Sequence, residues 1–466
     1  MTYDLVIKGG SVVTAGGVFV ADVAINGETI VAVGRSLAGK RELDAAGLLV
    51  TPGGIDLHVH LQYKVSGTVT CDDFYSGTRA AALGGTTAIV DFVESAPEQS
   101  LLEALEARRA EATGRAVIDF GLHMTIKPED VGKLDQIEGV VEAGSPSFKH
   151  YMAYGFALND GELLKSFEAI ARAGGIAIVH AENWDVIQAL TAQNLAMGRT
   201  GPEWHPRSRP PQFEAQAAGR AIDLAEFSGV PLHIFHVSTG LVVERVAAAR
   251  SRGLPVFAET CPQYLLLDDS VFERPGEEGG LPICSPPIRT RREQNELWAA
   301  LGRGQLQVVS TDHAPFTREQ KRAGLGDYSK TPGGVPGIQS RMMLLYTYGV
   351  RTGRMSLPQF AACCAATPAR IMGFSRKGQI AAGFDADIAV LDPEREMILS
   401  TETLQETSGW SPYEGLAVRG VPRYTISRGE LIVADGEFRG QEGWGQFVRR
   451  QRPRLNTSKI DTSATH

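Results

Sequence analysis

The chain has 466 residues, of which 43% are hydrophobic and 21% charged, and its formal net charge is −8. This composition indicates a globular protein with a large core, and the absence of a long basic run before the tail argues against a dominant nucleic-acid or membrane surface. No apolar stretch reaches the roughly 18 residues of a membrane span, the opening MTYDLVIKGG does not resemble a signal peptide, and the five cysteines include no C-x-x-C pair. We therefore expect a reduced, cytoplasmic chain without nucleic-acid or membrane partners.

Short strands separated by turns form both ends of the chain. Residues 1–52 alternate between apolar and polar positions, as in YDLVIKGGSVVT, and are interrupted by Gly, Asp and Asn turns. Residues 377–438 follow the same pattern, as in RYTISRGELIVADGEF. The simplest interpretation is one small β-sandwich domain built from both termini, which we place at 1–52 plus 375–440.

Strands and helices alternate in the middle of the chain. Eight apolar, β-branched runs are separated mostly by segments with helical spacing, such as SLLEALEARRAEAT. This alternation predicts parallel pairing, and eight such units over about 250 residues predict a (β/α)8 TIM barrel. The eight runs lie at 53–61, 86–93, 119–126, 147–154, 175–183, 231–238, 255–261 and 306–315.

Helical segments continue to about residue 374, so we place the barrel at 53–374. A doubly wound open sheet is the alternative fold for the same alternation. The polar, basic tail at 441–466 is expected to be a mobile arm, or one that embraces another subunit, and not a domain.

Barrel enzymes place their catalytic residues at the carboxyl ends of the strands, and five predicted strands carry reactive side chains there. The first ends in His58 and His60, whose i, i+2 spacing puts both imidazoles on one face. The fourth, fifth, sixth and eighth carry, in order, Lys149, His180, His236 and Asp312. Taken singly, each histidine could be a core residue and the aspartate a helix cap. Together, imidazole and carboxylate groups that converge from several strands suit Zn²⁺ and related cations.

Lys149 is the least ordinary member of this set. It lies in SFKHYMAYG, a predicted strand near the core, where burying an ammonium group costs several kcal/mol unless it is paired. Near the end of the second strand, Asp91 and Glu94 are candidates for groups that hydrogen-bond the metal ligands.

Several motifs resemble those of the cyclic amidohydrolases, and most closely the hydantoinase and dihydropyrimidinase family. The resemblance runs from about residue 3 to residue 448. The motifs are DLHVHL, GTVTCDDFYSGTRAAALGGTT, SFKHYMAY, HAEN, HVS, CSPPIRT, STDHAPF and KGQIAAGFDADIAVLDP.

The resemblance implies a site with two divalent metal ions, Zn²⁺ first and Mn²⁺ or Co²⁺ as alternatives. In that family the lysine reacts with carbon dioxide, so Lys149 is expected to be N6-carboxylysine and to bridge both ions. A neutral amine thereby becomes an anion that two cations stabilise. The resemblance also implies that one ion is bound by His58, His60 and Asp312 and the other by His180 and His236.

The same resemblance implies how the reaction proceeds. A hydroxide that bridges the two ions attacks the ring carbonyl of a cyclic amide. Asp312 accepts its proton and returns it to the leaving nitrogen. Tyr154 resembles the tyrosine that donates to the developing oxyanion.

Substrate contacts are also implied, and they leave alternatives open. Ser285, in CSPP, corresponds to a residue that binds substrate through its backbone. The loop TPGGVPGIQS has Gly333 where many hydantoinases have Asn, which favours the allantoinases, whereas HLQY followed by GTVTCDDF favours dihydropyrimidinases. Gln62 stands where dihydroorotases usually have Arg, which argues against that activity.

We therefore expect a hydrolase that acts on the carbon–nitrogen bond of a cyclic ureide, as a hydantoinase or dihydropyrimidinase. The alternatives are an allantoinase or cyclic imide hydrolase and, as a different class, a non-catalytic relative that acts as an interaction protein. Such relatives have lost metal ligands, whereas all six candidates are present here. The family resemblance also implies a homo-oligomer, either a tetramer or a dimer.

Overall fold

The computed structural model describes residues 2–65, 67–453 and 455. Within them, eight parallel strands form one sheet in which each strand pairs with the next, and a parallel bridge between Val59 and His313 joins its two edges. The strands are β6 (Gly54–Asp56), β9 (Thr86–Val93), β10 (Asp119–Thr125), β11 (Ser147–Tyr151), β12 (Ile176–His180), β13 (Leu232–Ile234), β14 (Val256–Thr260) and β15 (Val308–Val309).

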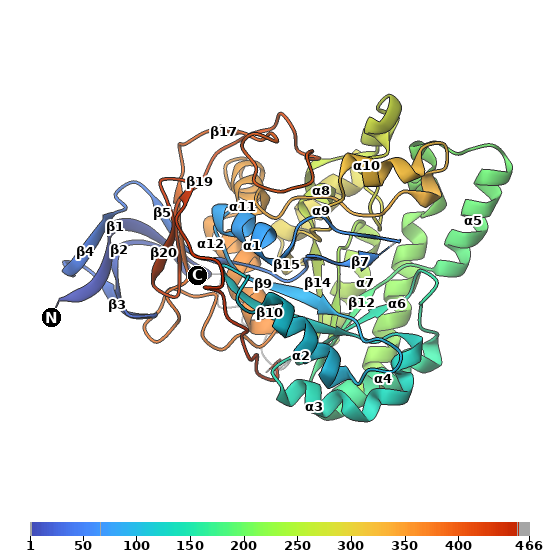
Figure 1. Cartoon of the computed structure of the whole chain (residues 1–466), viewed down its shortest axis with the longest axis horizontal. Helices are drawn as coiled ribbons and strands as arrows, with labels where there is room; N and C mark the ends of the chain where they lie inside the picture. The colour runs from blue at the N-terminus through green and yellow to red at the C-terminus, as the bar shows by residue number, and fades with distance from the viewer. Residues whose placement is uncertain (1, 66, 454, 456–466) are drawn as a thin grey trace.

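Helices cover the outside of this barrel, as Figure 1 shows for α2, α3, α4, α6 and α7. The strands are buried on both faces, which explains why TTAIVDFV and similar runs are almost continuously apolar. The helices are α1 (Phe74–Leu83), α2 (Leu101–Ala112), α3 (Ile137–Glu142), α4 (Asp160–Ala173), α5 (Trp184–Ala196), α6 (Pro211–Ser228), α7 (Gly240–Ser251), α8 (Pro262–Leu266), α9 (Arg291–Gly302), α10 (Arg318–Lys321), α11 (Arg341–Leu345), α12 (Leu357–Ala361) and α13 (Thr367–Ile371).

Strands from both chain ends form a second sheet, beside the barrel at the left of Figure 1. Nine strands of the described residues belong to it, and Val50 of β5 pairs with Val390 of β16, so the two termini meet at its centre. They are β1 (Tyr3–Thr14), β2 (Gly17–Asn26), β3 (Thr29–Gly34), β4 (Gly39–Asp44), β5 (Leu49–Pro52), β16 (Ile388–Asp392), β19 (Val421–Ser427), β20 (Glu430–Ala434) and β21 (Glu437–Phe438). The predicted barrel with a small β unit from both ends is confirmed.

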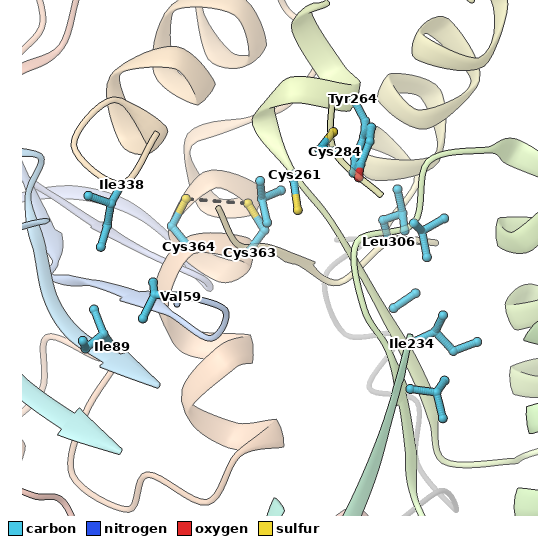
Figure 2. Close-up of a cluster of buried hydrophobic side chains, with 14 of the residues drawn as sticks. Val59, Ile89, Ile234, Cys261, Tyr264, Cys284, Leu306, Ile338, Cys363 and Cys364 are labelled. Atoms are coloured by element: carbon cyan, nitrogen blue, oxygen red, sulfur yellow. Dashed lines mark hydrogen bonds between the residues drawn. The ribbon is translucent and has the colours of Figure 1, made fainter. Parts of the chain in front are cut away.

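The core is divided in the same way. One apolar cluster, with Ile7, Val23 and Ile388, belongs to the second sheet, while the largest cluster lies around the barrel strands. Figure 2 shows part of the latter, where the buried thiols of Cys363 and Cys364 lie 3.9 Å apart. All five cysteines are free thiols.

The start of the tail lies against the barrel. Residues 446 and 448 hydrogen-bond the backbone of Phe120 in β10, and the buried guanidinium of Arg450 donates to the carbonyl of Leu122. The mobile or subunit-embracing arm is predicted for residues 441–466, and residues 454 and 456–466 of it lie outside the described residues. The predicted domain limits stay predictions. No helix in the described part of the chain is both long and apolar enough to cross a membrane.

Candidate active site

One cavity of about 670 Å³ opens at the carboxyl ends of the barrel strands. All the predicted metal-binding, catalytic and substrate-binding residues line it, although they come from positions up to 275 apart in the chain. They are His58, His60, Lys149, Tyr154, His180, His236, Ser285, Asp312 and Gly333.

His58, His60 and Asp312 form the tightest group in the cavity. Oδ1 of Asp312 lies 3.0 Å from Nε2 of His58 and 3.2 Å from Nε2 of His60. Their ligand atoms all lie within 4.8 Å of one another, which is a suitable arrangement for one cation. Burial raises the pKa of Asp312, but His58 and His60 lower it by more than burial raises it. The net pKa lies well below its ordinary value, so the carboxylate stays ionised.

Glu259, at the end of β14, fixes the orientation of His58. Its Oε1 accepts from Nδ1 of His58 at 2.8 Å, while Oε2 accepts from Ser310 at 2.9 Å and faces Nε2 of His233 at 3.3 Å. Burial raises the pKa of Glu259, but the hydrogen bonds from His233 and His58 lower it to about 2. A charged acceptor on Nδ1 leaves Nε2 of His58 directed at Asp312, as expected for a metal-binding histidine.

Lys149 lies beside these groups without a counter-ion. It is completely buried, and its Nζ has no hydrogen-bond partner or carboxylate within 4.0 Å among the described residues. The nearest aromatic centroid, that of Phe235, lies 4.4 Å away. Burial lowers the pKa of Lys149 to about 7. An ordinary salt bridge, the alternative role for a lysine on this strand, is therefore not what the structure shows.

His180 and His236 lie next to the first group. Their ring centroids are 4.5 Å apart, and that of His236 is 5.3 Å from His58. Nε2 of His180 is hydrogen-bonded to Glu182 at 2.7 Å, and Glu182 also accepts from Arg209 at 2.6 Å. Burial lowers the pKa of both histidines, which favours the neutral imidazole that binds a cation.

Three of these residues have strained backbones. Tyr154, His236 and Asp312 have φ values of 73°, 43° and 52°, a region that side-chain-bearing residues seldom adopt. Such strain persists only where the surroundings impose it, and it is commonest at functional sites. Here it turns three side chains into one cavity.

Tyr154 lies beside His180. Its ring centroid is 5.1 Å from that of His180, and it stacks on Phe156 at 5.6 Å. Burial raises the pKa of Tyr154, so its hydroxyl stays protonated and remains a hydrogen-bond donor at neutral pH.

Apolar side chains wall the cavity beyond Tyr154. Tyr63, Val65 and Phe156 line it, as expected for residues just past two strand ends. Its position just past the same strand end predicts that Leu158 also joins this wall, but its side chain is buried in the barrel core. Its backbone N–H bonds to the carbonyl of Tyr151, which directs the chain back towards the core.

The two carboxylates near the end of β9 have different surroundings. Asp91 accepts from Arg108 and from the backbone N–H of Leu61, so it supports the chain just after His60. Glu94 accepts from the hydroxyl of Tyr63 in the cavity wall. Neither carboxylate hydrogen-bonds a predicted metal ligand.

Sequence reasoning missed Glu259, Glu182 and Arg209. An acidic residue at the end of an apolar strand, as in PVFAETC, was a usable signal for Glu259, and HAEN was one for Glu182. Arg209 lies in an irregular segment after α5, and nothing local indicates that it reaches a carboxylate 27 residues earlier.

Comparisons with known proteins agree with this geometry. A profile described as Amidohydrolase family matches residues 49–432. The chain is 44% identical to a D-hydantoinase of Geobacillus stearothermophilus, over 95% of this chain and 96% of that protein, and 40% identical to a D-phenylhydantoinase of Escherichia coli, over 96% and 98%. The crystal structure of a dihydropyrimidinase from Brevibacillus agri superposes with a TM-score of 0.94 at 42% identity, over 96% of this chain and 98% of that one. This chain therefore belongs to the amidohydrolase family, and within it to the hydantoinases and dihydropyrimidinases.

Proposed function

We propose that this protein is a metal-dependent hydrolase that opens hydantoin or dihydropyrimidine-type rings at an amide bond. The observation that carries the proposal is the convergence of His58, His60, Asp312 and an unpaired Lys149 in one cavity of a chain from this family.

The residues present fit two divalent cations. His58, His60 and Asp312 offer one set of ligands, and His180 with His236 offers a second set beside it. The buried Nδ1 of His236 has no partner within the described residues, which is the kind of orphaned group that a ligand would satisfy. Bound cations, which we propose are Zn²⁺ with Mn²⁺ or Co²⁺ as substitutes, would supply a nucleophilic oxygen from water at neutral pH and polarise the ring carbonyl.

Lys149, which lines the same cavity, is the candidate for a ligand that both sets share. A buried lysine without a carboxylate is partly a neutral amine near pH 7, and a neutral amine can capture carbon dioxide. We propose that Lys149 is N6-carboxylysine, and its carbamate would help to hold the cations together with the two histidine sets. The free amine would otherwise remain unpaired in the barrel, at a cost of several kcal/mol.

The chain's own residues then manage the proton and the substrate. We assign Oδ2 of Asp312 to accept the proton of the attacking water and to return it to the ring nitrogen that leaves. The Tyr154 hydroxyl donates to the oxygen on which charge develops. The backbone groups of Ser285 and Gly333 bind the ring, and the apolar wall at Phe156 receives its substituent and excludes water.

Allantoin and cyclic imides are the second class of substrate. Gly333 is the observation that favours them, since it replaces the Asn of many hydantoinases, although glycine still supplies a backbone contact. The test is turnover of hydantoin, dihydrouracil, allantoin, dihydroorotate and succinimide by the purified protein. We expect hydantoin or dihydrouracil to be hydrolysed fastest. Fastest turnover of allantoin or succinimide would contradict the assignment, and no turnover at all would favour a non-catalytic interaction protein.

We also propose a reducing, cytoplasmic location and a homo-oligomer, either a tetramer or a dimer. The five free thiols support the first proposal. Membership of this family supports the second.

A further inference from the structure

A second buried lysine lies outside the cavity, between the two segments that carry Ser285 and Gly333. Lys321 ends α10 and is only 4% exposed. Its Nζ donates to the carbonyl of Ile283 at 2.8 Å and to the carbonyl of Pro332 at 2.7 Å. Within the described ranges it has no carboxylate within 4.0 Å, so carbonyl oxygens are its hydrogen-bond partners.

The first segment is fixed on both sides of Ser285. The carbonyl of Ile283 also accepts from the N–H of Gly334 at 3.0 Å, that of Cys284 accepts from His205 at 2.8 Å, and that of Pro286 accepts from Tyr264 at 2.8 Å. The carbonyl of Ser285 itself has no protein donor among the residues that the structure describes. The Ser285 carbonyl is therefore a free acceptor among neighbouring carbonyls that are all hydrogen-bonded. Ser285 itself lines the cavity.

The second segment repeats this arrangement around Gly333. The preceding carbonyl, of Pro332, is bound by Lys321, and the following N–H, of Gly334, is bound by Ile283. The N–H and carbonyl of Gly333 itself are unpaired within the described part of the chain. The two residues are neighbours, since a Cβ on Gly333 would lie 3.8 Å from Oγ of Ser285.

We infer that Lys321 is a positioning residue that joins these two segments, so that the free backbone groups of Ser285 and Gly333 face a cyclic ureide with fixed geometry. The inference rests on the proposed function. Its physical basis is that hydrogen bonds preorganised by their surroundings bind a ring more tightly than mobile backbone does. Nζ binds one carbonyl in each segment, two residues before Ser285 in the first and one residue before Gly333 in the second, and both of these residues line the cavity.

Lys321 can hold both carbonyls near neutral pH whether or not it is protonated. Burial lowers the pKa of Lys321 to about 7, against a smaller opposing effect of Cys284. Because both the ammonium and the neutral amine carry at least two N–H donors, both carbonyl contacts survive in either state. A carboxylate partner is therefore not required.

The test is Lys321→Met, which keeps the length and apolar packing of the side chain but removes its donors. With the ureide that the wild type hydrolyses best, we expect KM to rise about tenfold and kcat to change less than about threefold. Metal content should be unchanged, because Lys321 touches no metal-binding residue. Lys330→Met is the matched control: that lysine is on the same loop, its side chain is 70% exposed and its ammonium pairs with Asp327, so the KM of this variant should equal that of the wild type.

Hydrogen–deuterium exchange gives a second readout that needs no turnover. The amide of Gly334 should exchange faster in Lys321→Met than in the wild type or in Lys330→Met. Lys321→Gln keeps N–H donors on a shorter side chain, so its KM should lie between those of the wild type and Lys321→Met. Unchanged KM and exchange would overturn the inference, as would a loss of metal together with kcat. Failure of both Lys321 variants to fold would also overturn it, because a link between two loops should leave the barrel intact. Failure of the wild type on every ureide would instead refute the proposed function, while the exchange measurement would still judge Lys321.

Discussion

Removing the side chain of Phe156 should change which ring substituents the enzyme prefers. Phe156 lines the cavity, stacks on Tyr154 and meets the ring of Tyr151 edge-on at 5.1 Å. A benzyl substituent lying on one face of this ring would bury about 50 Å² of apolar area, which at about 25 cal/mol per Å² corresponds to about 1.3 kcal/mol. Phe156→Ala should therefore lower kcat/KM for 5-benzylhydantoin about tenfold relative to unsubstituted hydantoin.

The assay is kcat/KM for the two hydantoins in the wild type and in two alanine variants. Leu158→Ala is the control, because Leu158 is two residues away but buried in the core. That change should lower the free energy of unfolding by about 2–5 kcal/mol and leave the ratio of the two substrates unchanged. Equal losses on both hydantoins in Phe156→Ala would refute the reasoning, since they would show that Phe156 acts through Tyr154 and not through the substituent.

Three other substitutions test separate parts of the account. Lys149→Ala should lose metal and activity together and regain part of both with acetate, whereas Lys149→Arg should not, because a guanidinium stays protonated; a metal-replete, active Lys149→Arg enzyme would exclude the carbamate. Glu259→Gln should weaken metal affinity about 10–100-fold by removing the charged partner of His58, and metal titration with unchanged affinity would contradict this. Asp22→Asn should lower the free energy of unfolding by about 1–2 kcal/mol at pH 7, because Asp22 accepts from Lys8 and two backbone amides. Burial raises the pKa of Asp22, but these bonds lower it below 3.8, so the stabilisation is complete above that pH and is lost as pH falls. A difference in thermal unfolding between the wild type and Asp22→Asn that persists undiminished at pH 3 would argue against this.

Much of the fold could be predicted because its signals are local. Apolar runs such as TTAIVDFV report burial on both faces of a strand, and eight of them with helical spacing between most limit the fold to few possibilities. The main site residues could be predicted for the same reason: once the strands are known, His58, His60 and Asp312 are at the same end of the barrel.

The residues that could not be predicted from the sequence depend on contacts between distant segments. Glu259 reaches a histidine 201 residues earlier, and Lys321 reaches a carbonyl 38 residues earlier. No periodicity encodes such pairings. Leu158 also could not be placed from the sequence. It lies within a few residues of a strand end, but a backbone hydrogen bond to Tyr151 directs it into the core.

The central claim is that ring opening depends on divalent cations bound in this cavity. The most direct measurement removes metal with a chelator, returns Zn²⁺ stepwise, and follows bound metal by elemental analysis together with hydrolysis of hydantoin and dihydrouracil. The account predicts that activity disappears with the metal and returns as about two ions per chain are bound. Full activity in protein that contains no more than trace metal would contradict it.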